Sequence, residues 1–263
     1  MDEEKLKELL EKIMERARQT TPTSSETSCT YECELCHDTT WIVYKDEEGR
    51  NHCDPCVCQP VKKARDLLRA SGLAGFVDGC SFDNFETTKP VQKLLKDTAR
   101  KYVNDLLEIR GTDARKPWLY IGGNPGSGKT HICTAVCGDL LKNAMQVKYM
   151  RWMDDSRRLK FASAEDFEDL VDEFVQPTVL YIDDFLKQKY TPNPTFTDAD
   201  IKAAFRILDG RYMMNKATII SSEWDLVEHL MGADEAVFSR VYERCKGYTV
   251  MIDRKRENNY RLG

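Results

Sequence analysis

The sequence has no apolar run close to the ~18–20 residues that a membrane-spanning helix needs, and this excludes a transmembrane segment. It also has no recognisable secretory signal, because its first residues, MDEEKLKELL, are acidic and polar where such a signal is basic and then apolar. A net charge of −5 argues against a protein that coats nucleic acid through bulk positive charge. With 263 residues, of which 41% are hydrophobic, we expect a globular cytoplasmic protein without a membrane partner.

Internal repeats are also absent, and the composition changes along the chain. Apolar residues recur at helical spacing from Leu6 to Ala17, with charges of both signs between them, which predicts an amphipathic helix. Pro22 ends this helix, and the small polar residues TTPTSSETS cannot build a core. The predicted segments are an amphipathic helix over 1–20, a linker over 21–28, a cysteine-rich module over 29–60 and a larger domain over 61–263.

Short apolar runs alternate with helical patterns in the larger domain. This alternation is typical of βαβ units, and it predicts an α/β fold in which helices cover both faces of a mostly parallel sheet. The expected strands are KPWLYIGG (116–123), QVKYMRW (146–152), TVLYID (178–183), ATIISS (217–222) and YTVMI (248–252).

The motif GNPGSGKT fits G-x-x-x-x-G-K-[ST] and lies between an apolar strand and a helical pattern, as a phosphate-binding loop requires. Its glycines let the backbone turn tightly and present N–H groups to phosphate oxygens. Lys129 is predicted to reach the β- and γ-phosphates, and Thr130 to place its hydroxyl on Mg²⁺. The residues assigned to ATP binding are Gly123, Asn124, Pro125, Gly126, Ser127, Gly128, Lys129, Thr130 and His131.

An acidic pair follows the buried strand in VLYIDDF. Carboxylates at the end of a parallel strand lie beside the phosphate loop, so we assign Asp183 to Mg²⁺ and Asp184 to polarising the attacking water. Paired acids after a strand are often only a solvated turn. Their position after a complete phosphate loop favours the functional interpretation.

Two further patterns have a functional and a structural interpretation. The strand in TIISSEW should lie between the first and third strands of a doubly wound sheet, so its polar end, Ser221 to Glu223, would face the γ-phosphate. An ordinary strand end is the alternative. Arg240 and Arg244 lie on one face of a helix and are either surface charges or an arginine finger for the nucleotide of a neighbouring subunit.

Six of the ten cysteines fall within residues 29–58, which points to metal binding more than to disulfides in a reducing cytosol. The close pairs are separated by a strand–turn–strand pattern that one tetrahedral Zn²⁺ can hold together. So small a segment has too little apolar content to fold without such support. More cysteines are present than the four ligand positions require, and the candidates are Cys33, Cys36, Cys53, Cys56 and Cys58.

Taken together, these motifs resemble the bacterial and phage replicative helicase loaders of the DnaC/DnaI type, within the AAA+ ATPases. The resemblance covers most of the chain and follows the family's order. The motifs are CELCHDTTW with the later CVC, SGLAGF, SFDNF, GNPGSGKTH, YIDDF, LDGRYMMNKATIISSE, SRVYERC and NYRL. It implies an AAA+ P-loop core with a five-stranded parallel sheet between helices, without a full helical lid, preceded by a small zinc-binding module.

The resemblance also implies roles for individual residues. Lys129, Asp184 and Arg244 become the catalytic residues, with Arg244 rather than Arg240 as the finger. In the family's zinc element C-x-x-C is closed by C-x-C, which favours Cys33, Cys36, Cys56 and Cys58. The spacing of paired C-x-x-C units would instead favour Cys53 as a ligand. Glu223 departs from the asparagine that is commonest at the sensor position.

The function implied is ATP-driven loading of a hexameric replicative helicase onto single-stranded DNA by a ring or spiral of subunits. The N-terminal region, including the helix over 1–20, would grip the helicase. Basic residues beside an aromatic suit single-stranded DNA, whereas the alternative is a solvated helix with one core tryptophan. The residues concerned are Arg151, Trp152, Arg157, Arg158 and Lys160.

Two other functions are compatible with these motifs. The first is a transposase-helper ATPase of the related IstB type, although such helpers usually lack a cysteine module. The second is a nucleotide-gated adaptor with little turnover, because Asp184 stands where glutamate is commoner.

Overall fold

The computed structural model describes residues 31, 33–46, 48–188 and 194–261 of the chain. The predicted helix over 1–20 and linker over 21–28 lie outside these residues. The chain divides into two compact units, Met1–Asp66 and Leu67–Gly263, and helix α2 (Gln59–Ser71) crosses the boundary between them. No described helix combines the length and the apolar content that crossing a membrane requires.

The first unit contains an antiparallel hairpin of strands β1 (Trp41–Lys45) and β2 (Asn51–Pro55). The Asp46 carboxylate closes its turn by accepting the backbone N–H groups of Glu48 and Arg50 at 3.0 and 2.9 Å. Among the residues of this unit whose burial is described, only Cys36 and Cys56 are buried. The described part of this unit therefore has almost no apolar core.

The second unit is built on a five-stranded parallel sheet with the order β4-β5-β6-β3-β7. All the strands predicted from the sequence are present, and the strand from TIISSEW lies between the first and third strands of the domain, as predicted. The strands are β3 (Trp118–Gly123), β4 (Val147–Arg151), β5 (Val179–Phe185), β6 (Ala217–Ser222) and β7 (Thr249–Ile252).

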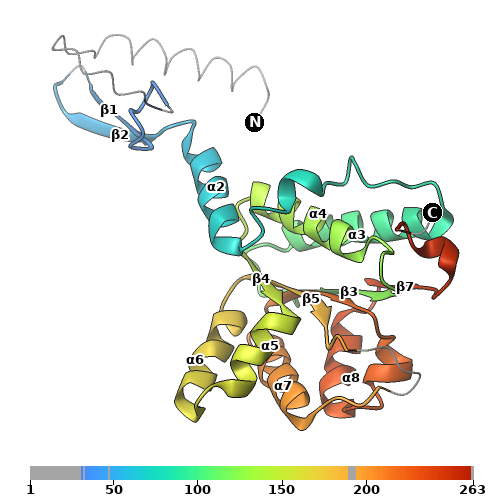
Figure 1. The fold of residues 1–263 in the computed structure, drawn as a ribbon. Coiled ribbons are helices and arrows are strands. Elements are labelled where there is room, and N and C mark those ends of the chain that lie inside the picture. The colour runs from blue at the N-terminus through green and yellow to red at the C-terminus, as the bar shows by residue number, and fades with distance from the viewer. Residues whose placement is uncertain (1–30, 32, 47, 189–193, 262–263) are drawn as a thin grey trace. The chain divides into compact units, whose positions relative to one another are not determined.

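Helices cover both faces of this sheet (Figure 1). Alternate strand residues enter opposite layers: Tyr181 of β5 packs with α3 and α4, whereas Leu180 and Ile182 pack with α5 to α8. The helices are α3 (Pro90–Glu108), α4 (Lys129–Lys142), α5 (Trp152–Phe161), α6 (Ala164–Val175), α7 (Asp198–Met213) and α8 (Glu235–Arg244). Single turns are η1 (Val77–Gly79), η2 (Leu226–Leu230) and η3 (Arg256–Asn258). The predicted α/β core with a five-stranded parallel sheet between helices is confirmed.

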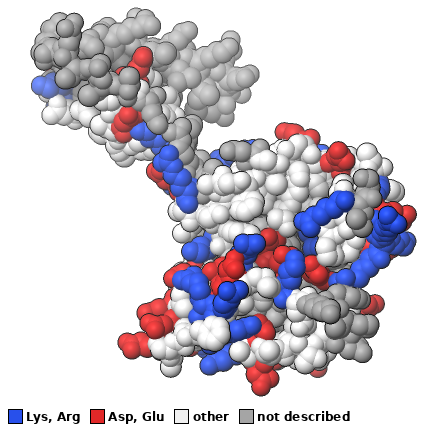
Figure 2. Space-filling view, viewed as in Figure 1, with Lys and Arg blue, Asp and Glu red and all other residues white. Residues whose placement is uncertain are grey.

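The sequence left two interpretations of the basic residues around Trp152, a DNA-contacting surface with an aromatic ring and a solvated helix with one core tryptophan, and the structure agrees with the second for Trp152. Trp152 is 2% exposed and packs edge-on against Phe185 in the core, so its ring is not available to stack on a base. Two basic side chains of α5 pair with acids, Arg158 with Asp155 at 3.1 Å and Lys160 with Asp200. In the face that Figure 2 shows, basic and acidic side chains are intermixed over this unit.

A buried arginine joins α6, α7 and β6. Arg211 is fully buried, and its Nε donates to the Thr218 hydroxyl at 3.0 Å. Its remaining donors satisfy the carbonyls of Phe174, Val175, Pro177 and Ala217. Burial lowers the pKa of Arg211 to about 9, so the guanidinium is still charged at neutral pH. Phe174 and Val175 end α6, Pro177 follows it and Ala217 begins β6, so these carbonyls lie where regular backbone partners run out.

We predict that Arg211→Met destabilises the second unit by about 3 kcal/mol, because it leaves several buried carbonyls without a donor. Arg206→Met is the matched control on the same helix, because Arg206 is exposed and makes a surface pair with Glu168, and it should cost less than about 0.5 kcal/mol. Urea unfolding followed by tryptophan fluorescence measures both, since Trp118 and Trp224 are buried in this unit. Equal losses in the two variants would contradict the role of Arg211.

Candidate functional site

The loop between β3 and α4 has the conformation that a phosphate-binding loop requires. Gly126 and Gly128 have φ angles of +75° and +85°, which L side chains rarely adopt. A Cβ at Gly126 would lie 2.1 Å from the Asn259 side chain, so the chain tail also closes on this loop. The backbone N–H of Tyr260 donates to the Gly126 carbonyl at 2.9 Å, which holds the tail in place.

Lys129 begins α4 and lies within this loop. Its Nζ donates to the carbonyls of Gly123 and Asn124 at 2.9 and 2.8 Å. Burial lowers the pKa of Lys129 to about 8, although the nearby carboxylates of Glu223 and Asp184 act in the opposite direction. The ammonium group is therefore desolvated and ready to pair with an anion that enters the loop.

The Asp183 carboxylate, 6% exposed, accepts hydrogen bonds from hydroxyl groups on four elements. The donors are Thr130 of α4 at 3.2 Å, Tyr149 of β4 at 3.0 Å, Tyr181 of β5 at 2.7 Å and Ser221 of β6 at 2.6 Å. Burial, with the neighbouring carboxylate, raises the pKa of the Tyr149 hydroxyl, which keeps it protonated as a donor. The structure thus brings together Thr130 and Asp183, the two residues predicted to hold Mg²⁺.

Asp184 and Glu223 lie on the same side of the site, joined by a lysine that sequence reasoning missed. Lys187 Nζ lies 2.8 Å from Asp184 Oδ2 and 3.1 Å from Glu223 Oε1. Lys187 lies only three residues after Asp184, but no motif marks it. Its contact with Glu223 depends on the pairing of β5 with β6, which brings the ends of these two strands together.

A pocket of about 560 Å³ joins these residues. The loop residues from Pro125 to His131 line it, together with Asp184, Lys187 and Glu223. The rest of the lining comes from two segments far apart in sequence, namely Asn84, Phe85 and Glu86 and the tail residues Tyr260 and Arg261. All of these except Glu86 belong to the SFDNF and NYRL motifs, which the sequence marked as family features without indicating their chemistry.

The two arginines of α8 lie at the opposite end of the strands. Arg244 is 6% exposed, and its guanidinium donates to the carbonyls of Lys116 and Tyr212 at 3.1 and 2.8 Å. Lys116 precedes β3, so this contact lies at the amino ends of the strands, whereas the P-loop follows their carboxyl ends. Arg240 pairs with Asp209 at 3.1 Å and is the more exposed of the two.

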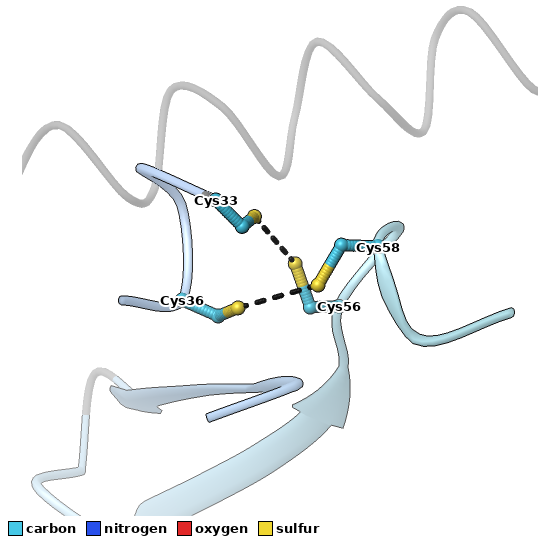
Figure 3. Close-up of side chains that lie close together, drawn as sticks. All are labelled: Cys33, Cys36, Cys56 and Cys58. Carbon is cyan, nitrogen blue, oxygen red and sulfur yellow. Dashed lines mark hydrogen bonds between the residues drawn. The ribbon is translucent and has the colours of Figure 1, made fainter. Parts of the chain in front are cut away.

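The first unit gathers four thiols in one cluster (Figure 3). The sulfur atoms of Cys33, Cys36, Cys56 and Cys58 all lie within 4.8 Å of one another. Cys33 lies 3.7 Å from Cys56, and Cys36 lies 3.4 Å from Cys58. Cys53 is exposed on β2, outside the cluster. This grouping matches the C-x-x-C with C-x-C arrangement and not the paired C-x-x-C alternative.

This donor set fits a zinc ion. Tetrahedral thiolate ligands about 2.3 Å from Zn²⁺ would lie about 3.8 Å from one another, within the range of the observed spacings. Burial opposes ionisation of Cys36, but its hydrogen bonds with Cys58 and Thr40 lower its pKa to about 7. Burial and the neighbouring thiols raise the pKa of Cys58. One thiol therefore ionises readily, and a dication would relieve the repulsion that opposes ionisation of the others.

The fold and the pocket define a P-loop nucleotide-binding protein of the α/β class, with an acidic pair at the strand end beside the loop. Comparison with known families agrees with this class. Residues 62–262 match the model of the IstB-like ATP binding proteins, so the chain belongs to that family.

Curated relatives include two proteins of Bacillus subtilis (strain 168). The chain is 33% identical to YqaM over 214 residues, which cover 79% of this chain and 66% of YqaM. It is 32% identical to the phage-like element PBSX protein XkdC over 238 residues, 88% of this chain and 85% of XkdC.

Proteins of DNA replication are also similar. The replicative helicase loader DnaC of Escherichia coli (strain K12) is 26% identical over 125 residues, 46% of this chain and 49% of DnaC. Among solved structures, that of DnaI has a TM-score of 0.50 at 20% identity and covers 74% of this chain and 93% of that one. The structural likeness concerns the fold alone.

We predict that the protein, purified under reducing conditions without chelator, contains about one zinc ion per chain by elemental analysis. Cys56→Ser should lose most of this zinc, because it removes a buried member of the cluster. Cys53→Ser, the matched control, should keep it, because Cys53 lies outside the cluster. Equal zinc contents in the two variants would exclude the assigned ligand set.

Proposed function

We propose that this protein is an ATP-dependent loader that delivers a hexameric replicative helicase to single-stranded DNA in the cytoplasm. The observation that carries the proposal is the sequence similarity to the replicative helicase loader DnaC. This chain also has the P-loop pocket that an ATP-dependent loader needs. The cysteine module before the core supports it, since transposase helpers usually lack one. In this proposal the N-terminal region, with the zinc-bound module, holds the helicase.

The pocket chemistry follows from the contacts described above. Lys129 exchanges its loop carbonyls for phosphate oxygens and compensates their charge. Thr130 and Asp183 hold Mg²⁺, which would compensate the charge on the β- and γ-phosphate oxygens. Asp184 orients the attacking water. Hydrolysis then acts as a timer for release of the helicase.

Assembly and DNA contact remain predictions. Arg244 lies at the end of the strands away from its own P-loop, and in this proposal it acts on the nucleotide of a neighbouring subunit in a ring or spiral. To do so it must give up its bonds to the Lys116 and Tyr212 carbonyls. The basic residues of α5 would contact DNA through phosphates, because the Trp152 ring is buried.

A transposase-helper function is the second candidate, and the match to the IstB-like family model favours it. Both functions use the same nucleotide pocket and differ in the partner that the ATPase remodels. A nucleotide-gated adaptor with little turnover would also use this pocket, and the short Asp184 side chain in place of glutamate is the feature that favours it.

We predict that Lys129→Ala weakens ATP binding about 100-fold or more, because it removes a buried charge from the phosphate loop. Lys142→Ala, on the exposed end of the same helix, should bind as the parent protein does. Titration with a fluorescent ATP analogue measures both. Unchanged affinity in Lys129→Ala would exclude this pocket as the ATP site.

The pH dependence of ATP binding follows from the same lysine. With a pKa of about 8, Lys129 is increasingly neutral above pH 8 in the free protein, whereas the bound phosphates favour its charged form. Binding therefore takes up a proton above pH 8, and affinity should fall as the pH rises, by up to about tenfold per pH unit. Calorimetry at pH 7 and pH 9 checks this, and equal affinities would contradict it.

The partner is identified by affinity purification of the tagged full chain from its native cytosol with ATP. We expect a hexameric replicative helicase to co-purify and to be lost when residues 1–60 are deleted. Lys129→Ala serves as the nucleotide control. Recovery of a transposase or integrase instead would overturn the loader proposal in favour of the second candidate.

A further inference from the structure

Lys187 occupies a position between two carboxylates that line the P-loop pocket. Its Nζ contacts Asp184 Oδ2 at 2.8 Å and Glu223 Oε1 at 3.1 Å. The side chains are 36% exposed for Lys187, 30% for Asp184 and 7% for Glu223, so the lysine spans from the open side of the pocket to its buried wall. Lys129 lies in the same pocket.

The backbone around Lys187 is held by the adjacent strand end. The Ser221 hydroxyl accepts the backbone N–H of Asp184 at 3.2 Å, and the Ser222 hydroxyl donates to the Phe185 carbonyl at 3.0 Å. Asp184 has a φ of +53°, outside the ordinary range for a side-chain-bearing residue. The backbone that leads to Lys187 is therefore held in place, whereas the Lys187 side chain can change its hydrogen-bond partners.

The pocket lining carries three basic side chains, Lys129, Lys187 and Arg261, and three carboxylates, Glu86, Asp184 and Glu223. Burial acts to lower the pKa of Lys187, but its pairing with Asp184 and Glu223 raises it overall, so it is charged at neutral pH. A terminal phosphate that enters the pocket brings additional negative charge. It competes with both carboxylates for the ammonium group of Lys187.

We propose that Lys187 distinguishes a nucleoside triphosphate from a diphosphate in this pocket. With a triphosphate, Lys187 turns from Asp184 to the terminal phosphate, which frees the Asp184 carboxylate to accept a hydrogen bond from water. With a diphosphate no group competes, and Lys187 keeps Asp184 and Glu223 paired. This inference rests on the proposed ATP site and adds the residue that couples the nucleotide's state to Asp184.

The test compares ATP and ADP affinities, with Mg²⁺, by displacement of a fluorescent nucleotide. Lys187→Met should lower the ratio of ATP to ADP affinity about tenfold, because it removes one charge-assisted contact with the terminal phosphate only. Lys187→Arg should restore the ratio to within about threefold of the parent protein, since it keeps the charge.

Lys142→Met is the matched control, because Lys142 also pairs with an acid three residues earlier, Asp139 at 3.3 Å, but lies outside the pocket. It should leave the ratio unchanged. Glu223→Gln provides a second, opposite test: it removes a competitor for Lys187 and should raise the preference for ATP. This variant also keeps the inference testable if Lys187→Met does not fold.

The outcomes separate this inference from the proposed function. If Lys187→Met keeps the parent ratio, or loses ATP and ADP affinity equally, while Lys129→Ala abolishes binding, only the inference about Lys187 is overturned. An unchanged or lowered ratio in Glu223→Gln also overturns it. If Lys129→Ala binds ATP normally, the ATP site itself is wrong.

Discussion

The hydroxyl groups that converge on the Asp183 carboxylate hold the P-loop pocket together. Strands β4, β5 and β6 and helix α4 each contribute one donor, so a single buried charge fixes four elements relative to one another. A buried carboxylate is costly unless its oxygens are satisfied, and this cost makes the arrangement specific. Ser221 extends the network, because its hydroxyl also accepts the backbone N–H of Asp184. The position of Lys187 beside Asp184 and Glu223 depends on that contact.

The two units are stabilised by different kinds of interaction. The sheet of the second unit is covered on both faces, and its strands are almost entirely buried. Such burial supplies the usual hydrophobic stabilisation of an α/β domain. The hairpin of the first unit is exposed along β2, and the buried residues in the described part of this unit are Cys36 and Cys56. A metal ion held by the four clustered cysteines would supply the stabilisation that so small a unit lacks.

Two arginines of the second unit show that the presence of a residue in a sequence motif does not identify what its side chain does. Arg211, within the LDGRYMMNK motif, is fully buried and satisfies backbone carbonyls. The preceding Gly210 is explained by close packing, since an added Cβ would lie 3.0 Å from Val175. Arg244 also contacts carbonyls, but it does so at the amino ends of the strands, near the start of β3. The same chemistry therefore serves the fold in one case and is proposed to serve assembly in the other.

The class of fold, the strands and the phosphate loop could be predicted from the sequence, because these depend on local patterns. The alternation of apolar runs with helical segments predicts a parallel sheet, and the spacing of GNPGSGKT predicts its loop. Only the tertiary structure decided which four cysteines meet, that Trp152 lies in the core, and that Lys187 joins Asp184 to Glu223. These facts depend on contacts between segments far apart in the chain. A local sequence pattern does not specify the distance between side chains of such segments.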